Sequence, residues 1–243
     1  MCGIAGIVSL KKITENSLEE YKKNVLNVLL HRGPDSYGTW NNNNVLFLHR
    51  RLKIIDLDDR ANQPFQTKDG RYRIVFNGEI YNYKSLAKKH LSDYVLKTES
   101  DTEVLLLLFE KFGLECVNLL RGIFAFAIID VAKDIIYIAR DNYGVKPLYY
   151  YFDDNIFIFA SEIKAIFSFG VKAELNDEVI AEQLIYGYVA GSNTIYKNIK
   201  RLLPGTFSKI SFANKLVVTS EDYFDATKNK IHYDSKLDDK IIA

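Results

Sequence analysis

Two nearly continuous apolar segments in the middle of the chain constrain its fold more than any other feature. Residues 123–130 (IFAFAIID) and 135–140 (IIYIAR) are separated only by the short segment 131–134. Strands that are apolar at almost every position are buried on both faces, so the sheet that contains them must lie between other layers. Because the connection is so short, the two strands are expected to pair in antiparallel fashion.

The rest of the pattern predicts further strand pairs and two blocks of helices. Strands are expected at residues 3–10 and 71–76, and in the pairs 37–40 with 45–49, 147–152 with 156–160, and 206–212 with 216–220. Helices are expected over 18–29, 84–91, 101–113, 114–120, 161–167 and 177–186, with Ser17, Asn82, Ser100, Ser161 and Asn176 as N-caps. Antiparallel hairpins with segregated helices predict an α+β layered fold and not a doubly wound parallel sheet.

Two local motifs add detail to this prediction. Asn77-Gly78 is the usual signal for a tight hairpin turn, but the residues after it predict a helix and not a second strand. We therefore predict a loop between strand and helix at Asn77-Gly78, a kind of segment that often carries function. Ser100 and Glu103 have the spacing of a capping box at the start of the 101–113 helix.

Composition narrows the classes of protein that the chain can belong to. The 243 residues fit one large domain or two small ones, and 48% hydrophobic with 26% charged residues is ordinary for a globular protein. A net charge of +1 without a basic block gives no reason to expect nucleic acid or a membrane surface as partner. With two cysteines, no secretory signal pattern and no apolar run of roughly 18 residues, we expect a cytoplasmic protein. Four scattered histidines give no metal-ligand spacing, so no metal site is expected.

Cys2 directly follows the initiator methionine. Once Met1 is trimmed, Cys2 carries both a thiol and a free α-amine, with ordinary pKa values of about 8.5 and about 8. The amine can therefore take the proton of the thiol, which is the N-terminal variant of nucleophilic catalysis. The alternative interpretation of Cys2 is a small buried hydrophobe, the common role of a free cysteine. We predict that Met1 is removed in the active protein, because an amide nitrogen at Cys2 cannot serve as the base.

A colinear series of motifs from Cys2 to about Tyr223 resembles the class II glutamine amidotransferases. The segments that carry this resemblance are 2–6 (CGIAG), 31–35 (HRGPD), 51–52 (RL), 77–82 (NGEIYN), 100–101 (SD) and 140–149 (RDNYGVKPLY). Residues 161–165 (SEIKA), 186–189 (YGYV) and 203–206 (LPGT) are similar to the asparagine synthetase branch. The resemblance implies a four-layer α-β-β-α sandwich of two antiparallel sheets, the fold of N-terminal nucleophile hydrolases.

The resemblance also implies which residues carry out the chemistry. Cys2 would attack the side-chain carboxamide of glutamine, while the Asn77 side chain and the Gly78 backbone N–H would stabilise the oxyanion. An ordinary turn is the alternative reading of Asn77-Gly78, and it is weakened by the helix that follows. His31-Arg32-Gly33-Pro34-Asp35 is expected to shape the pocket wall, because an N-terminal nucleophile needs no Cys–His pair. Cys116 is expected in the core.

Four more residues are implied as the glutamine-binding set. Arg51 matches the arginine of the family that binds the α-carboxylate, since a guanidinium is a planar two-pronged donor. A solvated surface charge is the alternative, and the neighbouring Arg50 competes for the role. Asp101 matches the carboxylate that binds the α-ammonium, although an acid in a first helical turn is favoured by the helix dipole alone. Glu79 and the backbone of Ile54 line the same pocket in the family.

These inferences predict a glutaminase domain over residues 1–223 and a linker over 224–243 toward an absent synthetase domain. The expected partners are L-glutamine and a C-terminal or separate ATP-dependent synthetase domain, and homodimerisation is left open. ATP and magnesium would be cofactors of that second domain only, because its Ser-Gly-Gly-x-Asp-Ser signature does not occur here. The chain would then be an excised piece or a free-standing ammonia donor.

Three alternatives to this function remain open from the sequence. The same glutaminase domain could supply ammonia to a sugar phosphate, a phosphoribosyl group or a polysaccharide. A regulatory module could keep the fold without turnover. An unrelated α+β binding domain would use Cys2 only as a buried hydrophobe.

Overall fold

The computed structural model describes residues 1–225, which form two six-stranded antiparallel sheets with helices. The strands are β1 (Gly3–Ser9), β2 (Ser36–Asn41), β3 (Val45–Arg51), β4 (Phe65–Gln66), β5 (Tyr72–Ile80), β6 (Gly122–Asp130), β7 (Ile135–Arg140), β8 (Tyr149–Phe152), β9 (Ile156–Ala160), β10 (Ile199–Arg201), β11 (Thr206–Ser211) and β12 (Val217–Asp222). The helices are α1 (Glu15–Val28), α2 (Tyr83–His90), α3 (Asp101–Phe112), α4 (Ile163–Phe167) and α5 (Asp177–Tyr186), with 3-10 turns η1 (Leu30–Arg32), η2 (Asp59–Ala61) and η3 (Gly113–Leu119).

Strands β9 and β1 lie in the middle of one sheet, and β7 and β6 lie in the middle of the other. One sheet has the order β10-β8-β9-β1-β3-β2 and the other β12-β11-β7-β6-β5-β4. Every strand pair within the two sheets is antiparallel, as the hairpin pattern predicts. The predicted α+β class is therefore confirmed.

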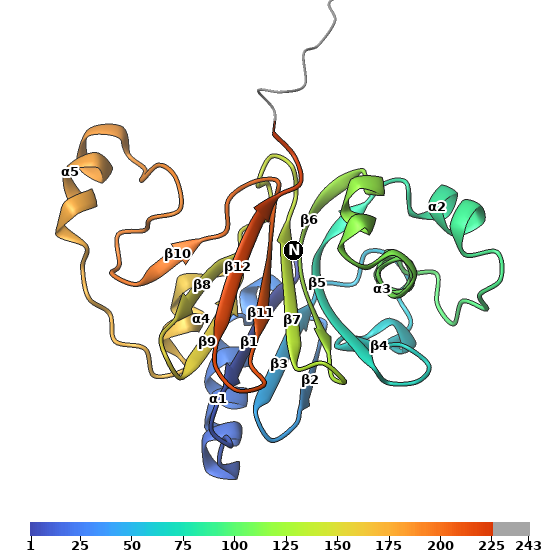
Figure 1. Ribbon diagram of the computed structural model, residues 1–243, viewed down its shortest axis with the longest axis horizontal. Helices are drawn as coiled ribbons and strands as arrows, with labels where there is room; N and C mark the ends of the chain where they lie inside the picture. The colour runs from blue at the N-terminus through green and yellow to red at the C-terminus, as the bar shows by residue number, and fades with distance from the viewer. Residues whose placement is uncertain (226–243) are drawn as a thin grey trace, which may run out of the picture.

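Three apolar clusters separate four layers. The middle cluster joins the facing sides of the two sheets, and the other two join each sheet to its helices, α1 with α4 on one side and α2 with α3 on the other (Figure 1). Strand β6 contributes to two clusters: Phe124, Phe126 and Ile128 face the helices, whereas Ala125 and Ala127 face the other sheet. Its alternate residues are buried on both faces, as the continuous apolar pattern predicts, and the α-β-β-α sandwich is confirmed.

The predicted loop at Asn77-Gly78 is wrong. Strand β5 continues through both residues to Ile80, and Gly78 lies opposite Phe124 of β6. A Cβ atom on Gly78 would lie 2.3 Å from the carbonyl oxygen of Ile123, so glycine is required for the close approach of the two strands. Asn-Gly here serves strand packing and not a turn, a distinction that depends on a strand more than 40 residues away in sequence.

Several predicted helix caps are also wrong. Helix α1 begins at Glu15 and is capped by Thr14, whose hydroxyl accepts a hydrogen bond from the backbone N–H of Ser17. Ser161 does not cap α4, because its hydroxyl accepts the N–H of Ile4 and so ties β9 to β1. Asn82 precedes α2, but its amide group contacts Leu119 and Arg121 instead of the helix. At Ser161 and Asn82 a more distant backbone group binds the side chain that the local pattern assigned to a cap, whereas at Ser17 the helix simply begins earlier.

At the start of α3, the predicted N-cap Ser100 is confirmed, whereas the predicted capping box with Glu103 is wrong. Ser100 caps the helix by accepting the N–H of Thr102. Glu103 does not complete a capping box with Ser100, since its carboxylate accepts the backbone N–H groups of Lys97 and Thr98. Glu103 therefore holds the loop before the helix and fixes the position of the helix start.

The last predicted elements are present with small changes. Residues 113–119 form a 3-10 turn where a helix is expected, Cys116 is fully buried in the core, and α5 follows Asn176, which makes no side-chain cap. Helix α5 lies outside the sandwich, with Val179 as its buried residue. Among residues 1–225, no helix combines the length and the apolar character needed to cross a membrane. The predicted linker spans residues 224–243, and all of it after residue 225 lies outside the described residues. The domain boundary therefore stays a prediction.

Candidate active site

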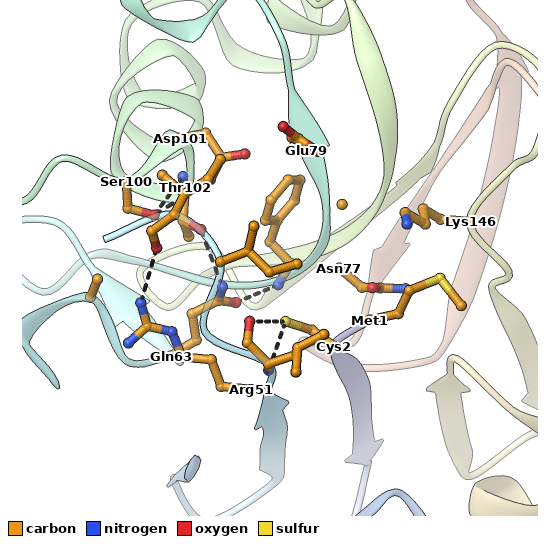
Figure 2. A pocket seen from close by; sticks show the side chains of 16 residues that line it. Met1, Cys2, Arg51, Gln63, Asn77, Glu79, Ser100, Asp101, Thr102 and Lys146 are labelled. Atoms are coloured by element: carbon orange, nitrogen blue, oxygen red, sulfur yellow. Dashed lines mark hydrogen bonds between the residues drawn. The ribbon is translucent and has the colours of Figure 1, made fainter. Parts of the chain in front are cut away.

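One cavity brings together every residue that the sequence implies for catalysis and substrate binding. It lies where β1 begins, β3 and β5 end and α3 begins (Figure 2). The predicted residues that line it are Cys2, Arg51, Ile54, Asn77, Gly78, Glu79 and Asp101. Arg50 does not line the cavity, and its guanidinium donates to the carbonyl of Leu26, so Arg51 is the arginine of this cavity.

Hydrogen bonds hold both the backbone and the side chain of Cys2 at the cavity. Arg32 Nε donates to the Cys2 carbonyl at 2.9 Å, and the N–H of Leu52 lies 3.5 Å from Sγ. Burial raises the pKa of the Cys2 thiol, while the Leu52 N–H, the N-terminal amine and Arg51 act in the opposite direction. A thiol with a raised pKa needs a base nearby to become a nucleophile.

The HRGPD segment positions Cys2 and does not form the pocket wall as predicted, since none of residues 31–35 lines the cavity. The buried Arg32 bridges the Cys2 carbonyl and Glu162, and His31 contacts the same carboxylate at 2.9 Å. Burial acts to raise the pKa of Glu162, but the hydrogen bonds from Arg32, His31 and Lys164 lower it to about 2. The histidine therefore serves an ion-pair cluster and does not pair with the thiol.

Asn77 presents an unused hydrogen-bond donor at the cavity. The residue is 1% exposed, and its Nδ2 has no hydrogen-bond partner within the described chain. A buried amide N–H without a partner costs roughly 1–3 kcal/mol, so such a group is retained where a ligand completes it. Together with Gly78, Asn77 can stabilise a negatively charged oxygen that forms beside Cys2.

Asp101 is a buried carboxylate at the first turn of α3. Its Oδ2 accepts the N–H of Ile80 at 3.0 Å, which joins α3 to the end of β5. Burial raises the pKa of Asp101 to about 6, and the negative charge of Glu79 acts in the same direction. A partly desolvated carboxylate of this kind has a strong preference for a cationic ligand group.

Arg51 is 5% exposed, so the solvated surface-charge interpretation is wrong. Its Nη1 donates to Asp58 O and to Asn62 Oδ1, and its Nη2 donates to the carbonyls of Ile55 and Asp56. The guanidinium thus holds the 55–62 segment beside the cavity. A substrate carboxylate can bind Arg51 in two-pronged fashion only after some of these carbonyls release it.

Gln63 and Lys146 also line the cavity, and sequence reasoning assigned a role to neither of them. Gln63 accepts the N–H of Phe76 through Oε1 at 2.6 Å and donates to Thr102, so it connects β5 to α3 behind Asn77. Lys146 lines the cavity from the 140–149 motif. The motif was a signal for Lys146, whereas nothing local distinguishes Gln63 from a surface glutamine. In the part of the chain that the structure describes, no group of three or more His, Cys, Asp or Glu side chains could hold a metal ion.

A cysteine at the second position, over a cavity at the end of a two-sheet sandwich, defines the N-terminal nucleophile class of amidotransferases. Within that class, the chain belongs to the glutamine amidotransferase domain family, whose sequence model matches residues 1–224.

Related proteins agree with this assignment. The chain is 35% identical to asparagine synthetase [glutamine-hydrolyzing] 1 of Bacillus subtilis over 93% of its own length and 36% of the relative's. It is 36% identical to the putative asparagine synthetase [glutamine-hydrolyzing] 2 of Methanocaldococcus jannaschii over 83% and 42%. The solved glutamine phosphoribosylpyrophosphate amidotransferase of B. subtilis shares the fold, with a TM-score of 0.65, 18% identity and coverage of 91% of this chain and 49% of that one. The chain therefore spans well under half the length of these two sequence relatives.

Proposed function

We propose that this domain hydrolyses L-glutamine to glutamate and ammonia through a thioester on Cys2. The observation that carries the proposal is the buried, unpartnered Nδ2 of Asn77 in the cavity that also holds the Cys2 thiol. A nucleophile and an unused oxyanion donor in one cavity are the minimum machinery for acyl transfer.

The reaction would proceed in two half-reactions. The α-amine of processed Cys2 takes the thiol proton, and the sulfur forms a bond to the side-chain carboxamide carbon of glutamine as the carbonyl electrons move to oxygen. Asn77 and Gly78 stabilise this oxyanion. When the carbonyl re-forms, the carbon–nitrogen bond breaks, and the amine delivers its proton to the departing ammonia. Water then attacks the thioester by the same route, which releases glutamate and regenerates the thiol.

The rest of the cavity would recognise the amino-acid end of glutamine. Asp101 pairs with the α-ammonium and Arg51 with the α-carboxylate once the 55–62 segment rearranges, with Glu79 and the backbone of Ile54 completing the pocket. The raised pKa of Asp101 supports this assignment, because a cationic ligand would offset the cost of its burial.

We also propose that the ammonia supplies an ATP-dependent synthetase domain that makes asparagine or a related amide. The names of the two sequence relatives support this acceptor, and their greater length leaves room for such a domain. ATP and magnesium would act only there, after a boundary near residue 223. Both cysteines are free, which supports a cytoplasmic site of action. A homodimer stays a prediction.

The decisive experiment is glutamate release from glutamine by the processed protein and by Cys2→Ala side by side. We expect glutamate release by the wild type and its loss in Cys2→Ala, with unchanged thermal unfolding. Cys116→Ala is the matched control, because this core cysteine should affect stability and leave turnover in place. Release that survives in Cys2→Ala would reject the mechanism, and no release by processed wild type would favour a silent regulatory module. Intact mass must show that Met1 is absent from the active material.

A further inference from the structure

Lys146 occupies the cavity without an ionic partner. It is only 8% exposed, and it lines the same cavity as Met1, Cys2 and Asn77, with its side chain near Met1 in Figure 2. Within residues 1–225, its ammonium group makes no hydrogen bond and no ion pair. A lysine this buried is normally paired, because an unpaired charge is costly to bury, so an unpaired lysine at the cavity indicates a functional role.

The backbone around Lys146 is fixed by its neighbours. Asp141 accepts the N–H groups of Tyr143, Val145 and Lys146 at 3.2, 2.9 and 3.0 Å. Arg140 Nε donates to the Lys146 carbonyl at 2.7 Å. Both peptide groups of Lys146 are therefore held, and its side chain lines the cavity.

The charged groups that face the chain's amino terminus are Cys2, Arg32, Asp35 and Lys146. Arg32 is compensated by Glu162 at 2.9 Å, and Asp35 accepts the N–H of Lys53 at 2.8 Å. Lys146 is the cation in this set that lacks such compensation. In the chain that still carries Met1, burial lowers the pKa of the Met1 α-amine, and the charges of Arg32 and Lys146 lower it further, against the effects of Cys2 and Asp35.

We propose that Lys146 is a positioning residue for this reaction: its positive charge adds to the effect of burial and favours the neutral form of the α-amine of processed Cys2, so that the amine can accept the thiol proton. The inference rests on the proposed glutaminase function. An ordinary α-amine has a pKa of about 8 and is mostly protonated at neutral pH, where it cannot act as a base. The positive charge of Lys146 disfavours a second positive charge on the α-amine. It therefore also favours transfer of the proton from the protonated α-amine to the departing ammonia.

The test compares Lys146→Met, Lys146→Arg and the control Lys209→Met, a change at an exposed lysine of β11. In Lys146→Met, the acid limb of the kcat/KM profile for glutamine should move to higher pH by about half to one unit, with little change at the alkaline plateau. Lys146→Arg and Lys209→Met should keep the wild-type limb. A purely structural role would lower the plateau and leave the limb in place. An unmoved limb in Lys146→Met, or a moved one in Lys146→Arg, would overturn the proposal.

A second measurement does not depend on turnover. Trace labelling of the α-amine with isotopic acetic anhydride across pH reports its pKa, which should rise by the same amount in Lys146→Met. If neither the wild type nor any variant releases glutamate but the amine pKa rises in Lys146→Met, the proposed function fails while the effect of Lys146 on the amine stands. Equal amine pKa values in wild type and Lys146→Met reject that role even if glutaminase activity is present. Should Lys146→Met fail to fold, Lys146→Gln takes its place.

Discussion

The polar side chains around Cys2 differ in whether their hydrogen-bonding or charged groups already have partners. Asn77 keeps a buried donor free, whereas Asp101 keeps a buried carboxylate whose pKa is raised to about 6. Arg51 is the opposite case, since its terminal nitrogens are all engaged by the 55–62 segment. The cavity thus offers a donor for an oxyanion and an acceptor for a cation before substrate arrives.

Replacement of Asn77 by alanine should lower kcat for glutamine by about 10²- to 10³-fold with little change in KM, because the lost donor acts on the transition state. Steady-state glutamate release measures both constants. Asn82→Ala is the matched control, since this asparagine follows the same strand outside the cavity. A fall in kcat of equal size in both variants would contradict the oxyanion role.

The carboxylate of Asp101 should make glutamine binding depend on pH. Only the ionised form attracts the substrate's α-ammonium, so KM should rise as pH falls through about 6. The measurement is KM for glutamine between pH 5 and pH 8 at constant ionic strength. Asp101→Asn should have a high KM without this dependence, and a flat wild-type profile would contradict the assignment.

At the scale of elements, the end of β5 determines the shape of the site. Gly78 lies against β6 so closely that a Cβ would meet Ile123 O at 2.3 Å and the Cα of Phe124 at 2.7 Å. Helix α3 packs on the same strand end through the bond from the N–H of Ile80 to Asp101. Asn77, Gly78 and Asp101 therefore keep their spacing through direct contacts among β5, β6 and α3.

Gly78→Ala should destabilise the protein by about 2–3 kcal/mol, because β5 and β6 must separate to admit the methyl group. Urea unfolding curves with equal slopes would report the loss of free energy of unfolding. Gly170→Ala is the control: its φ is +91°, but nothing lies within 4 Å of an added Cβ, so only backbone strain of about 1 kcal/mol is expected. Equal losses in the two variants would refute the steric explanation.

In the whole molecule, the sandwich is joined near Cys2 by an ionic cluster between distant segments. Glu162, just before α4, accepts from His31 and Arg32 of η1 and pairs with Lys164, while Arg32 also holds the Cys2 carbonyl. Stability and the position of the nucleophile are consequently coupled through one carboxylate. The HRGPD segment therefore acts on the nucleophile through the Cys2 carbonyl and not through the thiol.

Acid should weaken the fold through Glu162. Its ordinary pKa of 4.5 is lowered to about 2 in the folded protein, so its contribution to stability is complete above about 4.5 and is lost as pH falls through about 2. The difference in free energy of unfolding between wild type and Glu162→Gln should therefore shrink from pH 5 to pH 2. Asp101 titrates in the opposite sense but is present in both proteins and cancels. A constant difference across this range would contradict the assigned pKa.

Much of the architecture and the candidate site followed from local sequence. The continuous apolar runs predicted β6 and β7, and the motifs predicted a cavity that does contain Cys2, Asn77 and Asp101 together. The cap predicted at Ser17 failed because the helix begins earlier, at Glu15, with Thr14 as its cap. The caps predicted at Ser161 and Asn82 failed because a short polar side chain binds whichever backbone group the tertiary fold brings closest. Local spacing cannot reveal that choice.

The sequence by itself determined the α+β class, since strand periodicity is a local property of the chain, and its resemblance to the class II amidotransferases indicated the four layers and the chemical groups of the site. Only the tertiary structure decided that Asn77-Gly78 lies within a strand, that Arg51 is held by its own loop and that Lys146 enters the cavity unpaired. Each of these outcomes depends on contacts between segments far apart in sequence. Burial and partner geometry, and not the identity of a residue, set which polar groups stay free to react.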